Sequence, residues 1–187
     1  MDTYTERWGL LHTVQISSRY HARRQAFFER WGRVTSGIGV IFASSALADL
    51  VRDGGHAVAI ASAMLVTVAS TVDLVVGTSS MSVQHRDLRR RYLDLEATIR
   101  QSDNEPPKAD VDTWTQERFA IEADEPPKYT ALALLVENEL SRAEGRQGYD
   151  HLTPWERLTA HWCRWEDLPP KAAARPKSKP DKAEASA

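Results

Sequence analysis

The cysteine and histidine side chains are the first candidates for chemistry in this chain of 187 residues. Cys163 is the single cysteine, and His161 lies two positions before it. Residues two apart on a helix point to different faces, so these two are poorly placed to form a thiolate–imidazole nucleophile. A single cysteine forms no disulfide within the chain, which is consistent with polar segments that stay in a reducing compartment.

The histidines give no metal-binding motif. No two of the six histidines have the i, i+4 spacing of a helical zinc site, and the sequence contains no Cys-x-x-Cys. It also contains no glycine-rich phosphate loop and no Gly-x-Ser-x-Gly nucleophile motif. We therefore expect no catalytic residue, no bound metal and no cofactor, and a protein that is not an enzyme.

Asp49 and Asp73 are the unusual ionisable residues, because each lies inside an otherwise apolar run. The runs cover 34–51 and 57–76, and both are close to the roughly 20 residues that a helix needs to cross a bilayer. The segment 52–56 between them is short and polar. We interpret the two runs as a transmembrane helical hairpin. The alternative is a buried hairpin in a soluble helical bundle, which the many Ala, Ser and Gly residues also fit.

Arginines on both sides of the two runs predict the orientation of this hairpin. Residues 19–33 hold five arginines and one glutamate, and four more arginines lie in 86–91. The loop 52–56 offers only Arg52, next to Asp53. Because short segments rich in Lys and Arg stay in the cytoplasm, both termini of this multi-pass protein are expected on the cytoplasmic side of the membrane. The long charged leader before the first run predicts no cleavable signal peptide.

Each intramembrane aspartate needs an explanation, because a charge at the bilayer centre costs at least about 2.5–3.5 kcal/mol. Asp49 lies near the outer end of its run and is expected to face the outer headgroups. Asp73 lies one turn inside the cytoplasmic end, where it can form an ion pair with Arg33 at the start of the partner helix. It can instead line an aqueous pathway with Ser62 and Ser70, which share roughly its helical face. Both interpretations remain open.

Small residues at four-residue spacing, such as Gly39 and Ala43 or Ala59 and Ala63, favour close helix packing in lipid. They suit packing within the hairpin as well as contacts between subunits. We expect a homo-oligomer in the lipid bilayer, because two helices alone cannot enclose a water-filled path. The net charge of −2 argues against a dedicated nucleic-acid binder.

Residues 1–33 read as one weakly amphipathic helix that is cytosolic or interfacial. Tyr4, Trp8, Leu11 and Val14 fall near helical spacing. Further along, basic and aromatic residues suit the layer of anionic headgroups, which makes them a predicted lipid or partner interface. These interface residues are Arg23, Arg24 and Trp31. The other interpretation is a cytosolic helix packed on its neighbours.

Residues 78–168 are expected to form a cytosolic helical module. A helix over 82–101 presents one apolar stripe, and shorter helices are expected over 112–123 and 129–145. Thr153-Pro154-Trp155-Glu156 has the form of a capping box and opens a helix rich in tryptophan. Trp155, Trp162 and Trp165 are therefore a second predicted partner or lipid interface. The Pro-, Ala- and Lys-rich tail 169–187 is expected to be disordered.

The order of these parts resembles one known family. The relevant stretches are Arg19-Tyr20-His21-Ala22-Arg23-Arg24, His85-x-x-Leu88-x-x-x-Tyr92-x-x-Leu95-x-x-x-Ile99 and Tyr129-x-Ala131-Leu132-x-x-Leu135-x-x-Asn138-Glu139, with the hairpin 34–77 after the first. Together they look like the SLATT family, the SMODS- and SLOG-associating two-transmembrane effector domains, over about 19–141. The resemblance implies an effector encoded by a bacterium or phage that oligomerises and permeabilises the inner membrane in antiviral defence or abortive infection. It also implies partner proteins that generate or sense nucleotides. Asp49 and Asp73 are not part of its motifs.

The predicted fold is thus an all-α membrane protein, a two-helix transmembrane hairpin with flanking cytosolic helices. Two further functions compete with the pore-forming effector. A phage holin-like lysis protein is also a hairpin with both ends in the cytoplasm. Most of a holin is embedded in the membrane, so the large polar portion of this chain disfavours that function. A membrane-anchored scaffold would dock a cytosolic partner and leave the hairpin passive.

Overall fold

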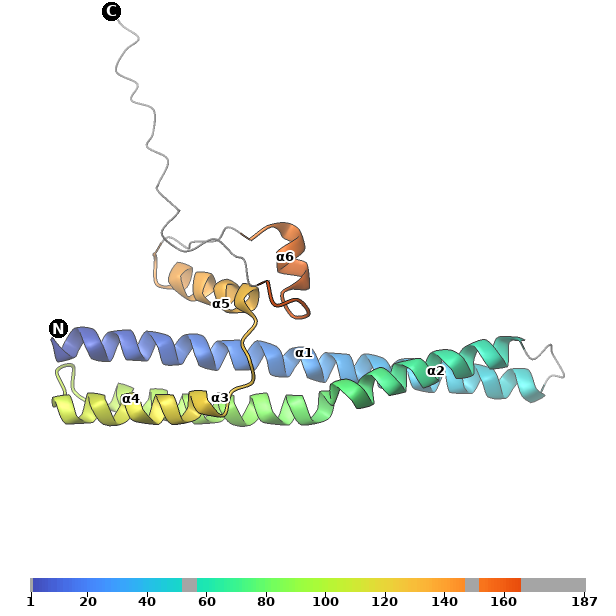
Figure 1. Ribbon diagram of the computed structural model, residues 1–187, viewed down its shortest axis with the longest axis horizontal. Helices are drawn as coiled ribbons and strands as arrows, with labels where there is room; N and C mark the ends of the chain where they lie inside the picture. The colour runs from blue at the N-terminus through green and yellow to red at the C-terminus, as the bar shows by residue number, and fades with distance from the viewer. Residues whose placement is uncertain (1, 52–56, 147–151, 166–187) are drawn as a thin grey trace, which may run out of the picture. The chain divides into compact units, whose positions relative to one another are not determined.

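Every regular element in the described part of this computed structural model is an α-helix (Figure 1). The structure describes residues 2–51, 57–146 and 152–165, and the side chains of 45–51 and 58 are not described. The predicted all-α class is confirmed for these residues. The expected disordered tail 169–187 and the loop 52–56 lie outside them. The helices are α1 (Thr3–Val51), α2 (Ala57–Val76), α3 (Thr78–Gln101), α4 (Lys108–Ala123), α5 (Thr130–Ala143) and α6 (Pro154–Thr159).

The backbone shows no break at the predicted boundary after Arg33. One helix, α1, runs from Thr3 to Val51 through both the charged leader and the first apolar run. No proline interrupts this stretch, and an isolated glycine costs only about 1 kcal/mol inside a helix. The predicted boundary after Arg33 is therefore a change from charged to apolar side chains along one continuous helix.

The N-terminal half of α1 packs antiparallel on α3. The guanidinium of Arg7 donates to the carbonyl of Ile99 at 2.9 Å, while further along α1 the ring of His21 meets the ring of His85. The buried positions alternate in steps of three and four on both helices, as in a heptad seam. On α1 this series comprises Arg7, Leu10, Val14, Ser17, His21, Arg24 and Phe28, with Ser18 and Tyr20 also buried beside it, and on α3 it comprises His85, Leu88, Tyr92, Leu95 and Ile99, with Thr78 also buried at the start of the helix.

The apolar stripe predicted for α3 is confirmed, and the one predicted for the start of α1 is partly wrong. Val14 is fully buried, but Tyr4 is 47% exposed. The buried face of α1 lies beside the predicted one. The prediction followed apolar residues, whereas the buried face is occupied largely by polar ones. Helix α4 covers the other side of the seam with Val111, Trp114 and Ile121, which join one apolar core with α1 and α3.

The chain divides into two compact units, Met1–Pro127 and Lys128–Ala187. In the second unit, the predicted helix over 129–145 is present as α5, and Gly145 after it has a φ of 74°. The predicted capping box is confirmed: the Thr153 hydroxyl accepts from the backbone N–H of Glu156 at 3.3 Å, and the Glu156 carboxylate accepts from the N–H of Thr153 at 2.7 Å. This box fixes the start of α6.

Candidate functional site

Helix α2 is the element that sets this chain apart from an ordinary helical bundle. Among the described residues, one helical stretch, Ala59–Gln101, is long and apolar enough to cross a membrane. Only 6% of its apolar window is buried within the structure. The core helix of a soluble protein would be mostly buried, so this surface calls for lipid or protein contacts that the single chain does not provide.

The exposed apolar surface continues from α2 onto the facing part of α1, which lies beside it (Figure 1). On α2, Leu74 and Val75 are 83% and 79% exposed. On α1, Val40 and Ile41 are 68% and 67% exposed. Burying apolar surface is worth roughly 25 cal/mol for each Å², so this face is stable only when it is covered. The remainder of the first predicted span, 45–51, lies outside the residues whose side chains are described, and Asp49 lies within it.

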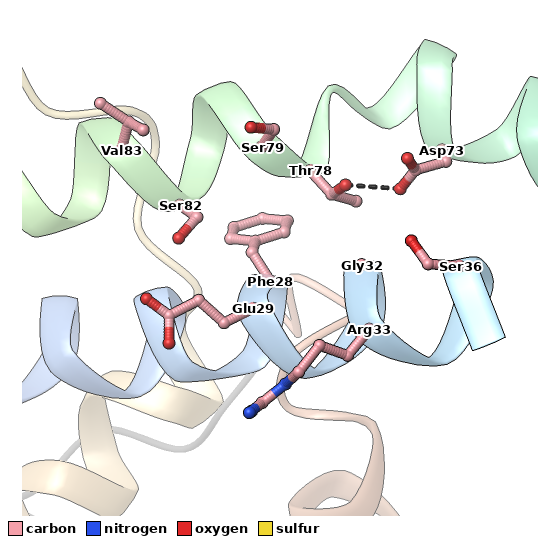
Figure 2. Close-up of a pocket in the computed structure, with 10 residues that line it drawn as sticks. All are labelled: Phe28, Glu29, Gly32, Arg33, Ser36, Asp73, Thr78, Ser79, Ser82 and Val83. Carbon is pink, nitrogen blue, oxygen red and sulfur yellow. Dashed lines mark hydrogen bonds between the residues drawn. The ribbon is translucent and has the colours of Figure 1, made fainter.

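A polar cleft opens at the base of this pair of helices, between α1 and the junction of α2 with α3 (Figure 2). Its volume is about 470 Å³. The residues that line it combine hydroxyls with both signs of charge. They include Glu29, Arg33 and Ser36 of α1, Asp73 of α2, and Thr78 and Ser82 of α3.

Asp73 is held in the cleft by a hydroxyl, and none of the described residues forms an ion pair with it. The Thr78 Oγ1 donates to Asp73 Oδ1 at 2.5 Å, and Ser36 points toward the same carboxylate (Figure 2). Arg33 extends away from Asp73 in this view. The predicted ion pair between Arg33 and Asp73 is therefore not formed. Antiparallel spacing places the two residues within reach, but the rotation of α1 directs Arg33 outward and Ser36 inward.

A second cavity of about 440 Å³ shares Ser36 and Asp73 with the first and also contacts Thr35, Gly39 and Ser70. The two cavities meet at these shared residues, and together they are called the groove. Ser70 and Asp73 both line this second cavity. The aqueous pathway itself stays a prediction. Ser62 lies elsewhere on α2 and is buried at 5% exposure, and it does not line either cavity.

A second polar cluster lies buried in the seam between α1 and α3. The Nδ1 atoms of His21 and His85 lie 2.8 Å apart, and His21 Nε2 lies 3.0 Å from a carboxylate oxygen of Glu125. The Tyr92 hydroxyl donates to that same oxygen at 2.6 Å. Both histidines are at most 1% exposed. Glu125 directly precedes Pro126-Pro127, so the cluster ties the end of the first unit to α1 and α3.

The geometry of this cluster determines where protons can lie. Two facing Nδ1 atoms need one proton between them, and a proton on each would place two N–H groups head to head. Burial, followed by the charges of His21 and Arg24, lowers the pKa of His85 to about 3. His85 is therefore neutral near pH 7. Burial and the hydrogen bond to Glu125 also raise the pKa of Tyr92, which stays protonated.

Inspection of the histidines for metal spacing missed this cluster, because its members come from three separate segments. The sequence does carry a signal for their burial, which is the spacing of three and four residues. His21 and Arg24 occupy buried heptad positions on α1, and His85 occupies one on α3. No group of three metal-ligating side chains forms anywhere in the described residues. The contacts among His21, His85, Tyr92 and Glu125 join these side chains into one buried hydrogen-bonding network.

The residues predicted as interfaces separate into exposed and buried ones. Arg24 is only 4% exposed, and its guanidinium lies 4.6 Å from the ring centre of Phe28, so its predicted role as a lipid contact is wrong. Arg23 and Trp31 are half-buried. Trp155 and Trp162 are 63% and 53% exposed, and their predicted role as a partner or lipid interface stays a prediction. Trp165 is half-buried, and its Nε1 donates to the Thr159 hydroxyl at 3.1 Å.

Comparisons of this chain with protein-family models, with curated proteins and with solved structures return no match.

Proposed function

We propose that this protein is a two-pass membrane effector that oligomerises and permeabilises the bacterial inner membrane, with both termini in the cytoplasm. One observation carries the proposal: α2 is apolar enough to span a bilayer, and almost none of its apolar window is buried by the rest of the chain. Lipid covers such a surface without any partner protein. The facing part of α1 supplies the second span.

The polar groove supports permeabilisation over passive anchoring. It contains Ser36, Ser70 and Asp73, and it lies along the contact between the two helices of the hairpin. Hydrophilic side chains within a membrane segment are costly unless they face protein or water. An oligomer that turns these grooves inward encloses a polar path and leaves the apolar faces of α1 and α2 to lipid.

The resemblance to the SLATT family supports a role in antiviral defence, with a nucleotide-generating or nucleotide-sensing partner that triggers the effector. A scaffold is the second candidate, because the exposed Trp155 and Trp162 offer a surface for a partner. A holin-like lysis protein is less favoured, because the helices outside the hairpin form an ordered apolar core.

The test is the oligomeric state in detergent combined with dye leakage from liposomes. We expect a homo-oligomer that releases dye, and we expect Asp73→Asn to change the leakage rate or its cation preference. The matched control is Asp87→Asn, which removes an exposed carboxylate of α3 outside the groove. A monodisperse monomer that leaves liposomes sealed would exclude the pore and leave the scaffold. Expression in cells gives the remaining comparison. Release of a co-expressed endolysin without any trigger would favour the holin.

A further inference from the structure

We propose that the groove holds a partly hydrated monovalent metal cation, such as K⁺ or Na⁺, on oxygen atoms of Asp73, Ser36 and Ser70, and that this site makes the pore cation-selective. The inference rests on the proposed function, because it names the ion that the permeable path accepts. The three side chains come from both helices of the hairpin, and all of them line the second cavity.

The hydroxyl groups of the hairpin differ in their hydrogen bonding. Those of Thr35, Ser44 and Thr67 donate to backbone carbonyls of their own helices at 3.0, 2.8 and 2.8 Å. This is the usual way in which Ser and Thr satisfy themselves inside a helix. Within the part of the chain that the structure describes, the hydroxyls of Ser36 and Ser70 form no such bond. Their oxygens are therefore left for a ligand in the groove.

Asp73 offers a carboxylate oxygen beside these hydroxyls. Its Oδ1 accepts from the Thr78 hydroxyl at 2.5 Å, and its Oδ2 accepts from none of the described residues. Ser36 points toward this carboxylate from the opposite helix without a hydrogen bond to it, whereas Arg33 extends away (Figure 2). Ser70 lies one turn before Asp73 on the same face of α2. A carboxylate in a membrane segment needs compensation, and here a cation in the groove supplies it.

The set of oxygen atoms fits a monovalent cation. Carboxylate and hydroxyl oxygens are hard ligands, which do not favour soft transition metals. Ca²⁺ takes about six to eight oxygen ligands, usually with carboxylates among them, whereas this site has the single carboxylate of Asp73. One negative charge balances one positive charge. The cavities of about 470 and 440 Å³ leave room for water to complete the coordination shell.

The position of the site determines what it does to ion flow. Asp73 lies in the last turn of α2, near the proposed cytoplasmic end of the path. In an oligomer with the grooves turned inward, each subunit contributes one Asp73, so the carboxylates form a ring. Rings of Asp or Glu attract cations and repel anions in channels. The pore should therefore pass K⁺ in preference to Cl⁻.

The experiment is a reversal-potential measurement on the full chain reconstituted in planar lipid bilayers, with different KCl concentrations on the two sides. We expect K⁺ to permeate at least about tenfold better than Cl⁻. Asp73→Asn should remove most of this preference, and Asp73→Glu should keep it, because the charge is retained. Asp87→Asn is the matched control for the lost carboxylate and should behave as wild type.

Ser36→Ala tests the hydroxyl ligand and provides the second variant if Asp73→Asn does not fold. Because a ligand to the cation is lost, the KCl concentration that gives half-maximal conductance should rise severalfold. Ser44→Ala is the control on the same helix, since its hydroxyl donates to the carbonyl of Val40 and does not line the groove. It should leave the conductance unchanged.

Channels equally permeable to K⁺ and Cl⁻, or a cation preference that survives Asp73→Asn, would overturn the cation site while leaving permeabilisation intact. A preference for Ca²⁺ over K⁺, measured with CaCl₂ on one side, would overturn the assignment to monovalent ions. Failure of the proposed function gives a different result, because no current would then appear in any salt, and the site would lose its basis.

Discussion

The buried pair of His21 and His85 is the residue-scale feature with the clearest physical consequence. Their Nδ1 atoms lie 2.8 Å apart, and the arrangement allows one proton between them. Glu125 fixes the other nitrogen of His21, while Phe28 stacks on the ring of His85 with centroids 5.7 Å apart. A second proton between the two Nδ1 atoms has no acceptor there. Protonation at low pH is therefore expected to destabilise the packing of α1 on α3.

We predict that stability falls as the pH falls below about 6.5. The pKa of His85 is about 3 in the folded chain and 6.5 when unperturbed, so the unfolded state binds the extra proton throughout this window. The contribution of His85 is fully present above pH 6.5 and is lost at up to about 1.4 kcal/mol per pH unit on acidification. Thermal unfolding in detergent between pH 7.5 and 5 measures it.

The variant His85→Gln should flatten this pH dependence and lower stability at pH 7.5. His12→Gln is the control, since His12 stacks on Trp8 within α1 and is not one of the side chains in the contact of His21 with His85 and Glu125. If the wild type and His85→Gln lose stability in parallel on acidification, the assignment to His85 is wrong.

At the scale of the element, the junction between α2 and α3 joins the apolar helix α2 to the polar seam between α1 and α3. Gly77 is the single residue between the two helices, with φ 61° and ψ 45° in the left-handed region. A Cβ at this position would lie 2.9 Å from Ser80 Oγ. The junction also carries the hydrogen bond from Thr78 to Asp73, so its geometry positions the polar cleft.

We predict that Gly77→Ala destabilises the protein by about 1–2 kcal/mol, because a left-handed backbone is costly for residues with a Cβ. Gly37→Ala is the matched control: Gly37 lies inside α1, and a Cβ there meets nothing within 4 Å. It should be neutral or stabilising by up to about 1 kcal/mol. Thermal unfolding in detergent compares the two, and equal effects would contradict a strained junction.

At the scale of the whole molecule, one continuous helix contacts both the apolar helix α2 and the polar seam with α3. Helix α1 packs on α3 through its N-terminal half and on α2 through its C-terminal half. A rotation of α1 would therefore move the seam and the groove together. If the proposed topology holds, this helix connects the proposed cytosolic helices to the proposed membrane hairpin without a break.

We predict that both termini lie in the cytoplasm, because arginines flank the hairpin on each side and the loop 52–56 has little net charge. Reporter fusions at residue 2 and after residue 168 should both give cytoplasmic signals in cells. Opposite signals at the two sites would mean that a single helix spans the membrane, and the proposed two-pass topology would then be wrong.

Several elements could be predicted from the sequence because the patterns that identify them are local. Apolar length identified α2, the stripe of Leu88, Tyr92, Leu95 and Ile99 identified the buried face of α3, and the Thr153–Glu156 pair identified the start of α6. These features depend on residues within a few turns of one another. Helical periodicity and capping chemistry are therefore sufficient to predict them.

The contacts between polar residues could not be predicted from the sequence, because they depend on tertiary packing. His21, His85 and Glu125 are far apart in the chain, and their contact depends on the register of α1 against α3 and on the return of the chain after α4. The same register buried Arg24, which sequence reasoning placed in the headgroups, and directed Arg33 away from Asp73. The rotation of a helix about its axis is set by packing over its whole length, so a spacing that places two residues within reach does not determine whether their side chains face each other.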